Sequence, residues 1–498
     1  MKQASESSVK NNETHKYIII GTGFSGMGMA IRLLQSGEKD FIMLDRAAEV
    51  GGTWRDNTYP GCACDIPSHL YSFSFDQNPN WSRLYSSSQE IQEYLVACAG
   101  KFNLRQYIRF NNSVNEMRFD EKADLWSVTT KEGVSYTARF VVAATGPLNE
   151  PIVPKVKGLK DFDGPVMHSG EWDHSVSLQG KKVAVIGTGA SAGQIVPAIA
   201  GNVGELAVFQ RTPPWVLPRK DRKISSKEKQ VYRLLPFALD KFRQWIYARL
   251  EVRGVGFTSS PFLMKLAEKG ARSYLKKQIE DPELRKKVTP DYAMGCKRIL
   301  MSDDYYPALT RENVSLYTGG LNKIEGNTLY CDDGSSFNAD VLILGTGFHG
   351  NKPLFGVDVF GVNGRSLQSE WGSNGPEGYY GVGVSGYPNF FTIHGPNTGL
   401  GHNSVVIMLE AQINLIKKIV DFTTSRGKTR VDVKPNIQES FNEDIQKRLS
   451  RAVWQEGGCH SWYQLDNGKN VVIWPGLTYS FIKETEAVSP DNFNFGLA

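Results

Sequence analysis

A glycine-rich motif that occurs twice, each time between an apolar run and a helical pattern, constrains the fold of this chain more than any other feature. The first copy reads Gly21-Thr-Gly23-Phe-Ser-Gly26. In a dinucleotide-binding fold the first glycine permits a tight turn, the second lets a pyrophosphate approach the backbone, and the third lets the helix pack on the strand. Asp45 ends the next apolar run, where an acid accepts hydrogen bonds from an unphosphorylated ribose, as in FAD or NAD.

The second copy differs from the first in the residues expected to contact the ribose. It reads Gly187-Thr-Gly189-Ala-Ser-Ala192, and the apolar run that follows leads to Arg211 and Thr212 rather than to an acid. A cation here suits a 2′-phosphate and favours NADPH. Either motif alone could be an ordinary strand-to-helix turn. Two motifs in full context predict an α/β protein with two Rossmann-like dinucleotide-binding domains, one for FAD and one for NADP.

Breaks in the pattern divide the 498 residues into five expected segments. Strand and helix signals alternate up to a segment with two prolines at 151–154, and a charged, helix-favouring stretch later interrupts the second nucleotide unit. Strand-like runs at 328–330 and 340–344 are expected to resume the second sheet. The segments are 1–150, the first part of the FAD-binding domain; 151–221, the first part of the NADP-binding domain; 222–295, a helical insertion; 296–384, the second part of the NADP-binding domain; and 385–498, the second part of the FAD-binding domain.

Composition argues against several other classes of protein. The net charge of +5 is small, and no basic block is interleaved with aromatic residues, so no nucleic-acid partner is expected. No apolar stretch reaches membrane length, so we expect a cytoplasmic protein without a membrane partner; a monomer is compatible, and the oligomeric state stays open. Six scattered cysteines predict reduced thiols. Cys62 and Cys64 lack the spacing of a redox pair or a zinc site, which argues against a dithiol oxidoreductase and a metal centre.

A longer pattern lies between the two glycine motifs. Its fixed positions, F-x-G-x-x-x-H-x-x-x-W-[P/D], are filled by Phe162, Gly164, His168, Trp172 and Asp173. This segment resembles the fingerprint of the type I Baeyer–Villiger monooxygenases, which are class B flavoprotein monooxygenases. A second pattern of that family, [A/G]-G-x-W-x-x-x-x-[F/Y]-P-[G/M]-x-x-x-D, is met by residues 51–65.

The resemblance covers nearly the whole chain, because it continues through residues 297–298, 395–399, 461–463 and 474–476. Cys296 and Ile299 depart from the threonine and proline of the cyclic-ketone enzymes, and Asp45 replaces a more usual glutamate. The late segments are more similar to the ethionamide-activating branch than to the cyclic-ketone enzymes. That affinity bears on the substrate range rather than on the reaction.

The resemblance implies an NADPH- and O₂-dependent FAD monooxygenase that converts ketones to esters or lactones through a C4a-peroxyflavin, with possible sulfoxidation. Its catalytic residues would be Arg298 and Asp65. Arg298 would stabilise the anionic peroxide and polarise the substrate carbonyl, since a guanidinium stays protonated. Asp65 would orient that arginine through a charged hydrogen bond.

Cofactor contacts also follow from the matched positions. Lys297 would join Arg211 and Thr212 at the 2′-phosphate, whereas the alternative for each cation alone is a solvated charge. Thr53, Trp54 and Tyr71 would line the flavin; the alternative for the aromatic residues is a place in the core.

The fingerprint is expected to act in conformational coupling rather than in acid–base chemistry. In the family, His168 and Trp172 lie in the linker between the domains, and a buried core histidine is the alternative. The nearest rival function is a flavin-containing monooxygenase acting mainly on N or S centres, against which Trp172, Asp173 and Arg298 argue. A redox sensor that binds both cofactors without turnover is a second rival. The sequence leaves open which ketone or sulfide is used.

Overall fold

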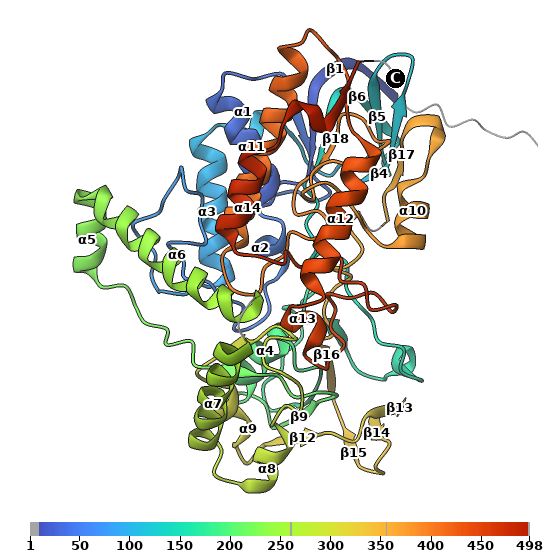
Figure 1. The fold of residues 1–498 in the computed structure, drawn as a ribbon. Coiled ribbons are helices and arrows are strands. Elements are labelled where there is room, and N and C mark those ends of the chain that lie inside the picture. Colours follow the sequence, from blue (N-terminus) through green and yellow to red (C-terminus); the bar gives the residue numbers. More distant parts are fainter. Residues whose placement is uncertain (1–8, 259–260, 355, 497–498) are drawn as a thin grey trace, which may run out of the picture.

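Two α/β domains, each built around its own sheet, make up the protein (Figure 1). The structure is a computed structural model that describes residues 9–258, 261–354 and 356–496. The first domain lies at the top of Figure 1 and the second at the bottom. Within the described residues, no helix has the length and apolar character needed to cross a membrane.

The first domain surrounds an eight-stranded sheet in which β1 lies between β2 and β6, parallel to both. Every residue of β2 is buried, as expected for a parallel strand covered on both faces. Helix α1 (Phe24–Gln35) follows the first glycine motif, and α11 (Val405–Thr424) packs beside α1 (Figure 1). The strands are β1 (Val9–Ile20), β2 (Phe41–Leu44), β3 (Ile108–Arg109), β4 (Val114–Asp120), β5 (Leu125–Thr130), β6 (Val134–Ala143), β17 (Asp358–Phe360) and β18 (Phe390–Thr392).

The second domain surrounds a five-stranded parallel sheet of order β12-β9-β8-β16-β7. Helix α4 (Ala190–Ile199) begins within the second glycine motif and packs against α9 (Tyr305–Leu309). The strands are β7 (Val166–His168), β8 (Lys182–Ile186), β9 (Glu205–Phe209), β12 (Val314–Tyr317) and β16 (Val341–Leu344).

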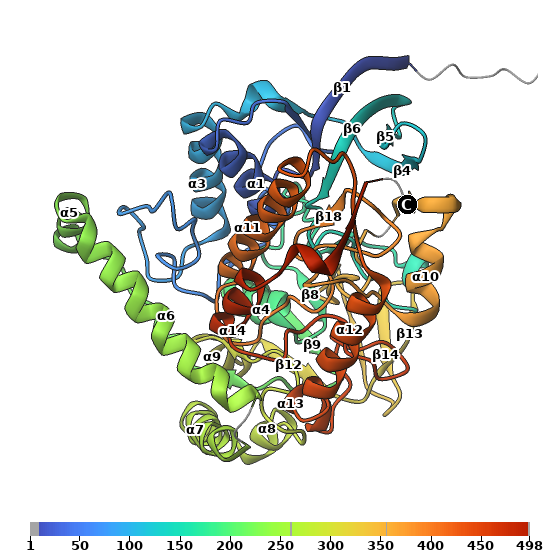
Figure 2. The ribbon, with the colours of Figure 1, turned by 45° about the horizontal axis from the view of Figure 1, so that its top comes forward.

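Four helices occupy most of the stretch expected to be a helical insertion. Helix α5 begins with a capping box formed by Ser225 and Glu228, and α8 begins after Asp281, whose side chain accepts from two backbone N–H groups. Figure 2 shows α5 and α6 extending along the outside of the molecule. The helices are α5 (Ser226–Leu234), α6 (Pro236–Thr258), α7 (Pro261–Gln278) and α8 (Pro282–Lys287).

Two expected placements differ in the structure. The run at 328–330 forms β14 (Thr328–Cys331) in a separate antiparallel sheet with β13 (Leu321–Glu325) and β15 (Ser336–Asn338), because short glycine turns on each side fold the strands back on themselves. The chain also reaches the first sheet before residue 385, since β17 pairs with β4.

The remaining helices and strands lie outside the two main sheets. They are α2 (Thr53–Asp56), α3 (Ser88–Lys101), β10 (Val216–Leu217), β11 (Leu300–Met301), α10 (Leu367–Asn374), β19 (Val431–Val433), α12 (Pro435–Leu449), α13 (Val453–Glu456), α14 (Thr478–Glu486) and β20 (Phe493–Phe495).

Candidate active site

The first glycine motif forms a cradle lined by backbone. Gly21 has a φ of 101°, and a Cβ added there would lie 2.5 Å from the Ala144 carbonyl oxygen. A Cβ at Gly26 would collide with the Gly21 carbonyl, so helix α1 approaches β1 as closely as the motif predicts. Gly23 faces the backbone of Gly52, and side chains at these two positions would fill the space that a pyrophosphate needs.

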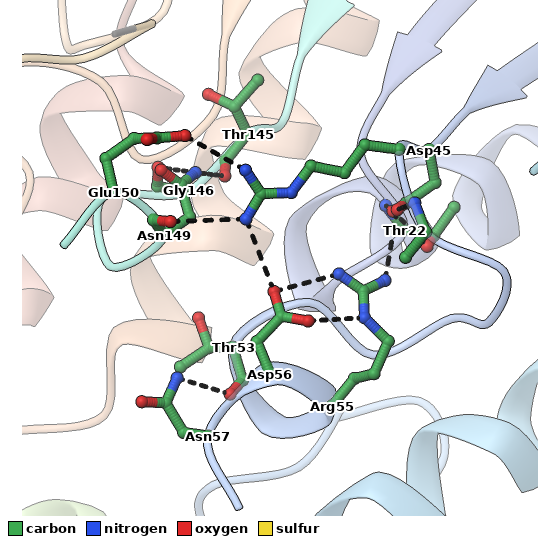
Figure 3. A network of polar contacts seen from close by, with 12 residues as sticks. Thr22, Asp45, Thr53, Arg55, Asp56, Asn57, Thr145, Gly146, Asn149 and Glu150 are labelled. Carbon is green, nitrogen blue, oxygen red and sulfur yellow. Dashed lines mark hydrogen bonds and ion pairs between the residues drawn. The ribbon is translucent and has the colours of Figure 1, made fainter. Parts of the chain in front are cut away.

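Asp45 stands beside this cradle at the end of β2, where the sequence places it. Its Oδ2 accepts from the Thr22 backbone N–H at 2.8 Å, and Oδ1 accepts from Arg55 Nη1 at 3.1 Å (Figure 3). The carboxylate is buried and held in one orientation next to the motif. Its place beside the motif agrees with the expected contact to an unphosphorylated ribose, which stays a prediction.

An ion-pair network extends from Asp45 towards the segment after β6 (Figure 3). Arg55 Nε donates to Asp56 Oδ1 at 2.7 Å, and Arg46 lies 3.7 Å from Asp56 and 3.1 Å from Glu150. The network joins Asp45, helix α2 and the start of the interdomain linker. These ion pairs hold the three segments in fixed positions relative to one another.

Two of the expected flavin-lining residues, Thr53 and Trp54, begin α2, and the third, Tyr71, contacts Trp54. Trp54 Nε1 donates to the Tyr71 hydroxyl at 3.3 Å, and the two rings meet edge to face. Tyr71 also contacts Phe24, the first residue of α1. Burial raises the pKa of Tyr71 well above its usual value. Thr53 precedes Trp54 in α2, and the residue before this helix, Gly52, lies against Gly23 of the first glycine motif.

The second glycine motif is joined to its cationic turn by a hydrogen bond. Thr188, inside the motif, donates through its hydroxyl to the Thr212 carbonyl at 2.9 Å. Gly187 has a φ of 113°, Gly189 faces open space, and Ala192 is buried against Gly345. This region therefore has the close helix–strand packing and the open loop of a nucleotide site.

Two cations converge near this turn. Burial lowers the pKa of Lys297, and the positive charge of the exposed Arg211 lowers it further. Neighbouring like charges suit a dianionic 2′-phosphate.

We expect Arg211→Ala to raise the KM for NADPH by about 10–100-fold and to change the KM for NADH little, because NADH lacks the phosphate. Initial rates with both nucleotides check this. Lys181→Ala, at another exposed cation, is the control, and an equal effect on both nucleotides would contradict the assignment.

Arg298 and Asp65, which lie far apart in the sequence, form an ion pair. Arg298 donates to Asp65 Oδ2 from Nε at 3.0 Å and from Nη2 at 2.5 Å, and Nη1 lies 3.4 Å from the Leu400 carbonyl oxygen. Pairing of β10 with β11 fixes the backbone directly after Arg298. The charge of Asp65 raises the pKa of Arg298. Its side chain keeps 34% exposure, so the cation is oriented and still open to a ligand.

A disulfide between Cys296 and Cys459 corrects the expectation that all thiols are reduced. The Cα atoms lie 6.1 Å apart although 163 residues separate them, so chain spacing could not reveal the pair. The bond joins the segment of Arg298 to the loop that carries Tyr463. The other four cysteines, Cys62, Cys64, Cys98 and Cys331, are free and buried.

Tyr463 is a site residue to which the sequence analysis gave no role. Burial raises its pKa to about 12, and the positive charge of Arg298 opposes that shift. The phenol is 1% exposed and lies near both Arg298 and Asp65. Its only signal in the sequence is its place in the segment 461–463, which also carries the family resemblance.

The fingerprint lies on the second domain and faces the first. His168 ends β7 and pairs with Leu344 of β16; its ring meets Phe348 edge to face. Burial lowers the pKa of His168, and the backbone of Gly347 opposes that shift. A Cβ at Gly164 would collide with the Asp340 carbonyl, and Phe162 packs in the core beside β16.

The other end of the fingerprint reaches the interdomain surface. Asp173 is exposed and accepts from the Ser175 backbone N–H at 2.9 Å. Trp172 helps to line a pocket of about 300 Å³ whose walls come from both domains and the linker. These contacts suit a coupling role for the fingerprint. The residues that line the pocket are Arg46, Asp56, Asn57, Leu148, Asn149, Gly170, Glu171, Trp172 and Phe348.

We expect His168→Ala to slow oxygenation by about 10-fold and to leave FAD binding unchanged, because it removes packing between β7 and the segment after β16 without touching the first glycine motif. Oxygenation rate and flavin content per protein check this, with Lys160→Ala as a control in the same segment. Unchanged oxygenation, or loss of flavin from the variant, would contradict the coupling role.

Comparisons with known proteins agree with this arrangement. A family model described as pyridine nucleotide-disulphide oxidoreductase matches residues 18–235. A Baeyer-Villiger monooxygenase of Pseudomonas aeruginosa is 48% identical over 467 residues, which are 94% of this chain and 88% of the relative. One of Streptomyces coelicolor is 44% identical over 483 residues, 96% and 93% of the two chains. The crystal structure of OTEMO in complex with FAD and NADP has a TM-score of 0.87 at 25% identity and covers 97% of this chain and 99% of its own.

Similarity of this extent over nearly the whole of both chains identifies the family. The α/β class with two dinucleotide-binding domains is confirmed, as is the resemblance drawn from the fingerprint. The affinity to the ethionamide-activating branch stays a prediction. The chain belongs to the Baeyer–Villiger monooxygenase family.

Proposed function

We propose that this protein uses FAD, NADPH and O₂ to convert ketones to esters or lactones. The observation that carries the proposal is the Arg298 guanidinium, which Asp65 orients while it stays open to a ligand. The reaction consumes one ketone, one O₂, one NADPH and one proton, and it yields one ester, NADP⁺ and water.

The residues of the first domain fit FAD. The backbone cradle of Gly21, Gly23 and Gly26 suits the pyrophosphate, and Asp45 suits the ribose. Trp54 and Tyr71 offer aromatic surface beside the cradle. Bound FAD, reduced by NADPH, supplies the activation of O₂.

The chain's own residues make the transfer to a ketone possible. Arg298 polarises a carbonyl and stabilises negative charge on oxygen, since a guanidinium stays protonated, and the charge of Asp65 raises its pKa further. Asp65 holds the guanidinium plane and moves no proton. Arg211, Thr212 and Lys297 would hold NADP at its 2′-phosphate through turnover.

The test is a panel of linear, cyclic and aromatic ketones and of sulfides, scored by NADPH consumption and by product. We expect a yellow protein that forms one ester or lactone per NADPH consumed with at least one ketone, and less sulfoxide. Oxygenation at N or S centres alone would favour the alternative function, a flavin-containing monooxygenase. A colourless protein without FAD would overturn the proposal.

Several narrower assignments also rest on this function. Ketones are the main substrates and sulfides the secondary ones, in a cytoplasmic protein that has access to FAD and NADPH. The five-segment division of the chain is part of the same proposal, with β17 added to the part that completes the FAD-binding domain.

A further inference from the structure

Exposed apolar side chains are concentrated on the helical insertion. Among the described residues, fourteen large apolar side chains are exposed, and nine of these lie between residues 231 and 266. Isolated exposed apolar residues are ordinary, whereas a cluster marks a contact surface. We call the exposed side of α5, α6 and the start of α7 the insertion surface.

The exposed residues of α6 lie on one face of the helix. Phe237, Trp245 and Val252 are 64%, 55% and 69% exposed, and they are spaced by about two helical turns. The opposite face carries Leu239 and Ile246, which are buried. Helix α6 is therefore anchored on one side and leaves an apolar stripe on the other. Figure 2 shows that this helix runs along the outside of the molecule.

Helix α7 continues the apolar character at its start and becomes basic towards its end. Phe262 and Leu266 are 73% and 58% exposed, one turn apart. Lys269 and Lys276 follow on the same face at helical spacing and are exposed. Apolar residues beside lysines on one helical face are typical of helices that lie in a membrane interface.

The insertion is much more basic than the rest of the chain. Residues 226–278 contain twelve Lys and Arg but only four Asp and Glu, whereas the whole chain has a net charge of +5. All four acids have partners: Glu228 pairs with Arg222, Glu268 pairs with Arg272, Glu251 accepts from Asn403 at 2.6 Å, and Asp240 accepts from Gln77 Nε2 at 2.5 Å. Lys241 and Arg249 lie between the apolar residues of the α6 stripe and are exposed.

We propose that the insertion surface binds the face of a lipid bilayer that contains anionic lipids. Phe237, Trp245 and Phe262 enter the interface, and Lys241, Arg249 and Lys269 contact the headgroups. Charge favours this partner over a second copy of the chain, since two insertion surfaces would bring like charges together. The binding is peripheral, because no described helix can cross the bilayer. It revises the expectation that the protein has no membrane partner.

Vesicle flotation with the full-length holoprotein tests the proposal. We expect binding to vesicles of equal parts phosphatidylcholine and phosphatidylglycerol, little binding to phosphatidylcholine alone, and release at high salt. The double variant Phe237→Ser, Trp245→Ser should lower the affinity for anionic vesicles by at least about 10-fold. The double variant Lys241→Glu, Lys269→Glu should lower it by at least about 10-fold as well. Val153→Ser and Tyr479→Ser, at exposed apolar residues outside the insertion, should bind like the unmodified protein.

The rate of NADPH oxidation serves as the control for folding, and we expect it to be unchanged in all these variants. Absence of binding by the unmodified protein would overturn the proposal, as would equal binding to both kinds of vesicle or equal loss in the control variants. The molecular mass in solution distinguishes a second copy of the chain as the partner. The surface would be assigned to a second copy if this mass doubled as the protein concentration rose and returned to that of one chain in the Phe237→Ser, Trp245→Ser variant.

Discussion

Arg298→Ala is expected to lower the rate of ester formation by about 10²–10³-fold while NADPH still bleaches the flavin in the absence of O₂. The guanidinium is the cation that Asp65 orients, and its loss removes the stabilisation of negative charge on oxygen. Arg298→Lys keeps a charge but not the two parallel donors, so we expect an intermediate rate. Product analysis under saturating ketone and anaerobic stopped-flow reduction separate the two steps.

Arg365→Ala provides the matched control for this variant. Arg365 also pairs with a carboxylate, at 2.7 Å from Glu370, but it belongs to the part of the first domain near β17. Its replacement should leave ester formation within a few fold. If Arg298→Ala formed ester at the unmodified rate, Arg298 would have no catalytic role, and if it failed to bind FAD, its role would be structural.

Asp65→Ala is expected to lower ester formation by about 10²-fold, because the guanidinium loses the acceptor that sets its plane. The carboxylate accepts from both Nε and Nη2, and the remaining contact, to the Leu400 carbonyl, is 3.4 Å long. Asp65→Asn keeps one acceptor oxygen and should lose less. Steady-state rates with one ketone, with flavin content measured in each variant, check this order.

A double-mutant cycle distinguishes orientation from an independent role of Asp65. If Asp65 acts through Arg298, the Asp65→Ala and Arg298→Ala double variant should be no slower than Arg298→Ala alone. Losses that multiply in the double variant would instead show that Asp65 contributes directly to the reaction.

The sequence predicted the parts of the fold that depend on local pattern. Gly21 and Gly187 adopt the positive φ that the two motifs require, and Asp45 stands at the end of β2 beside the first of them. These features follow from a few adjacent residues, for which the physical demands of a strand, a tight turn and a helix are specific. The family patterns added the pairing of Arg298 with Asp65, which no periodicity could reveal.

Features that depend on distant contacts could not be predicted in this way. Cys296 and Cys459 meet because the C-terminal loop folds back over the second domain, and the approach of Tyr463 to Arg298 depends on the same fold. Strand β17 joins the first sheet through pairing with β4. Thr328–Cys331 had the composition of a sheet strand, but its partners are its own neighbours in the chain.

The most direct test of the account is the origin of the oxygen atom in the product. The purified protein, NADPH and an accepted ketone are incubated under ¹⁸O₂, and the ester is analysed by mass spectrometry. We expect one ¹⁸O atom in the alkoxy oxygen of the ester or lactone, and loss of that product in Arg298→Ala. An ester without the label, or NADPH consumption that yields only hydrogen peroxide with every ketone, would contradict it.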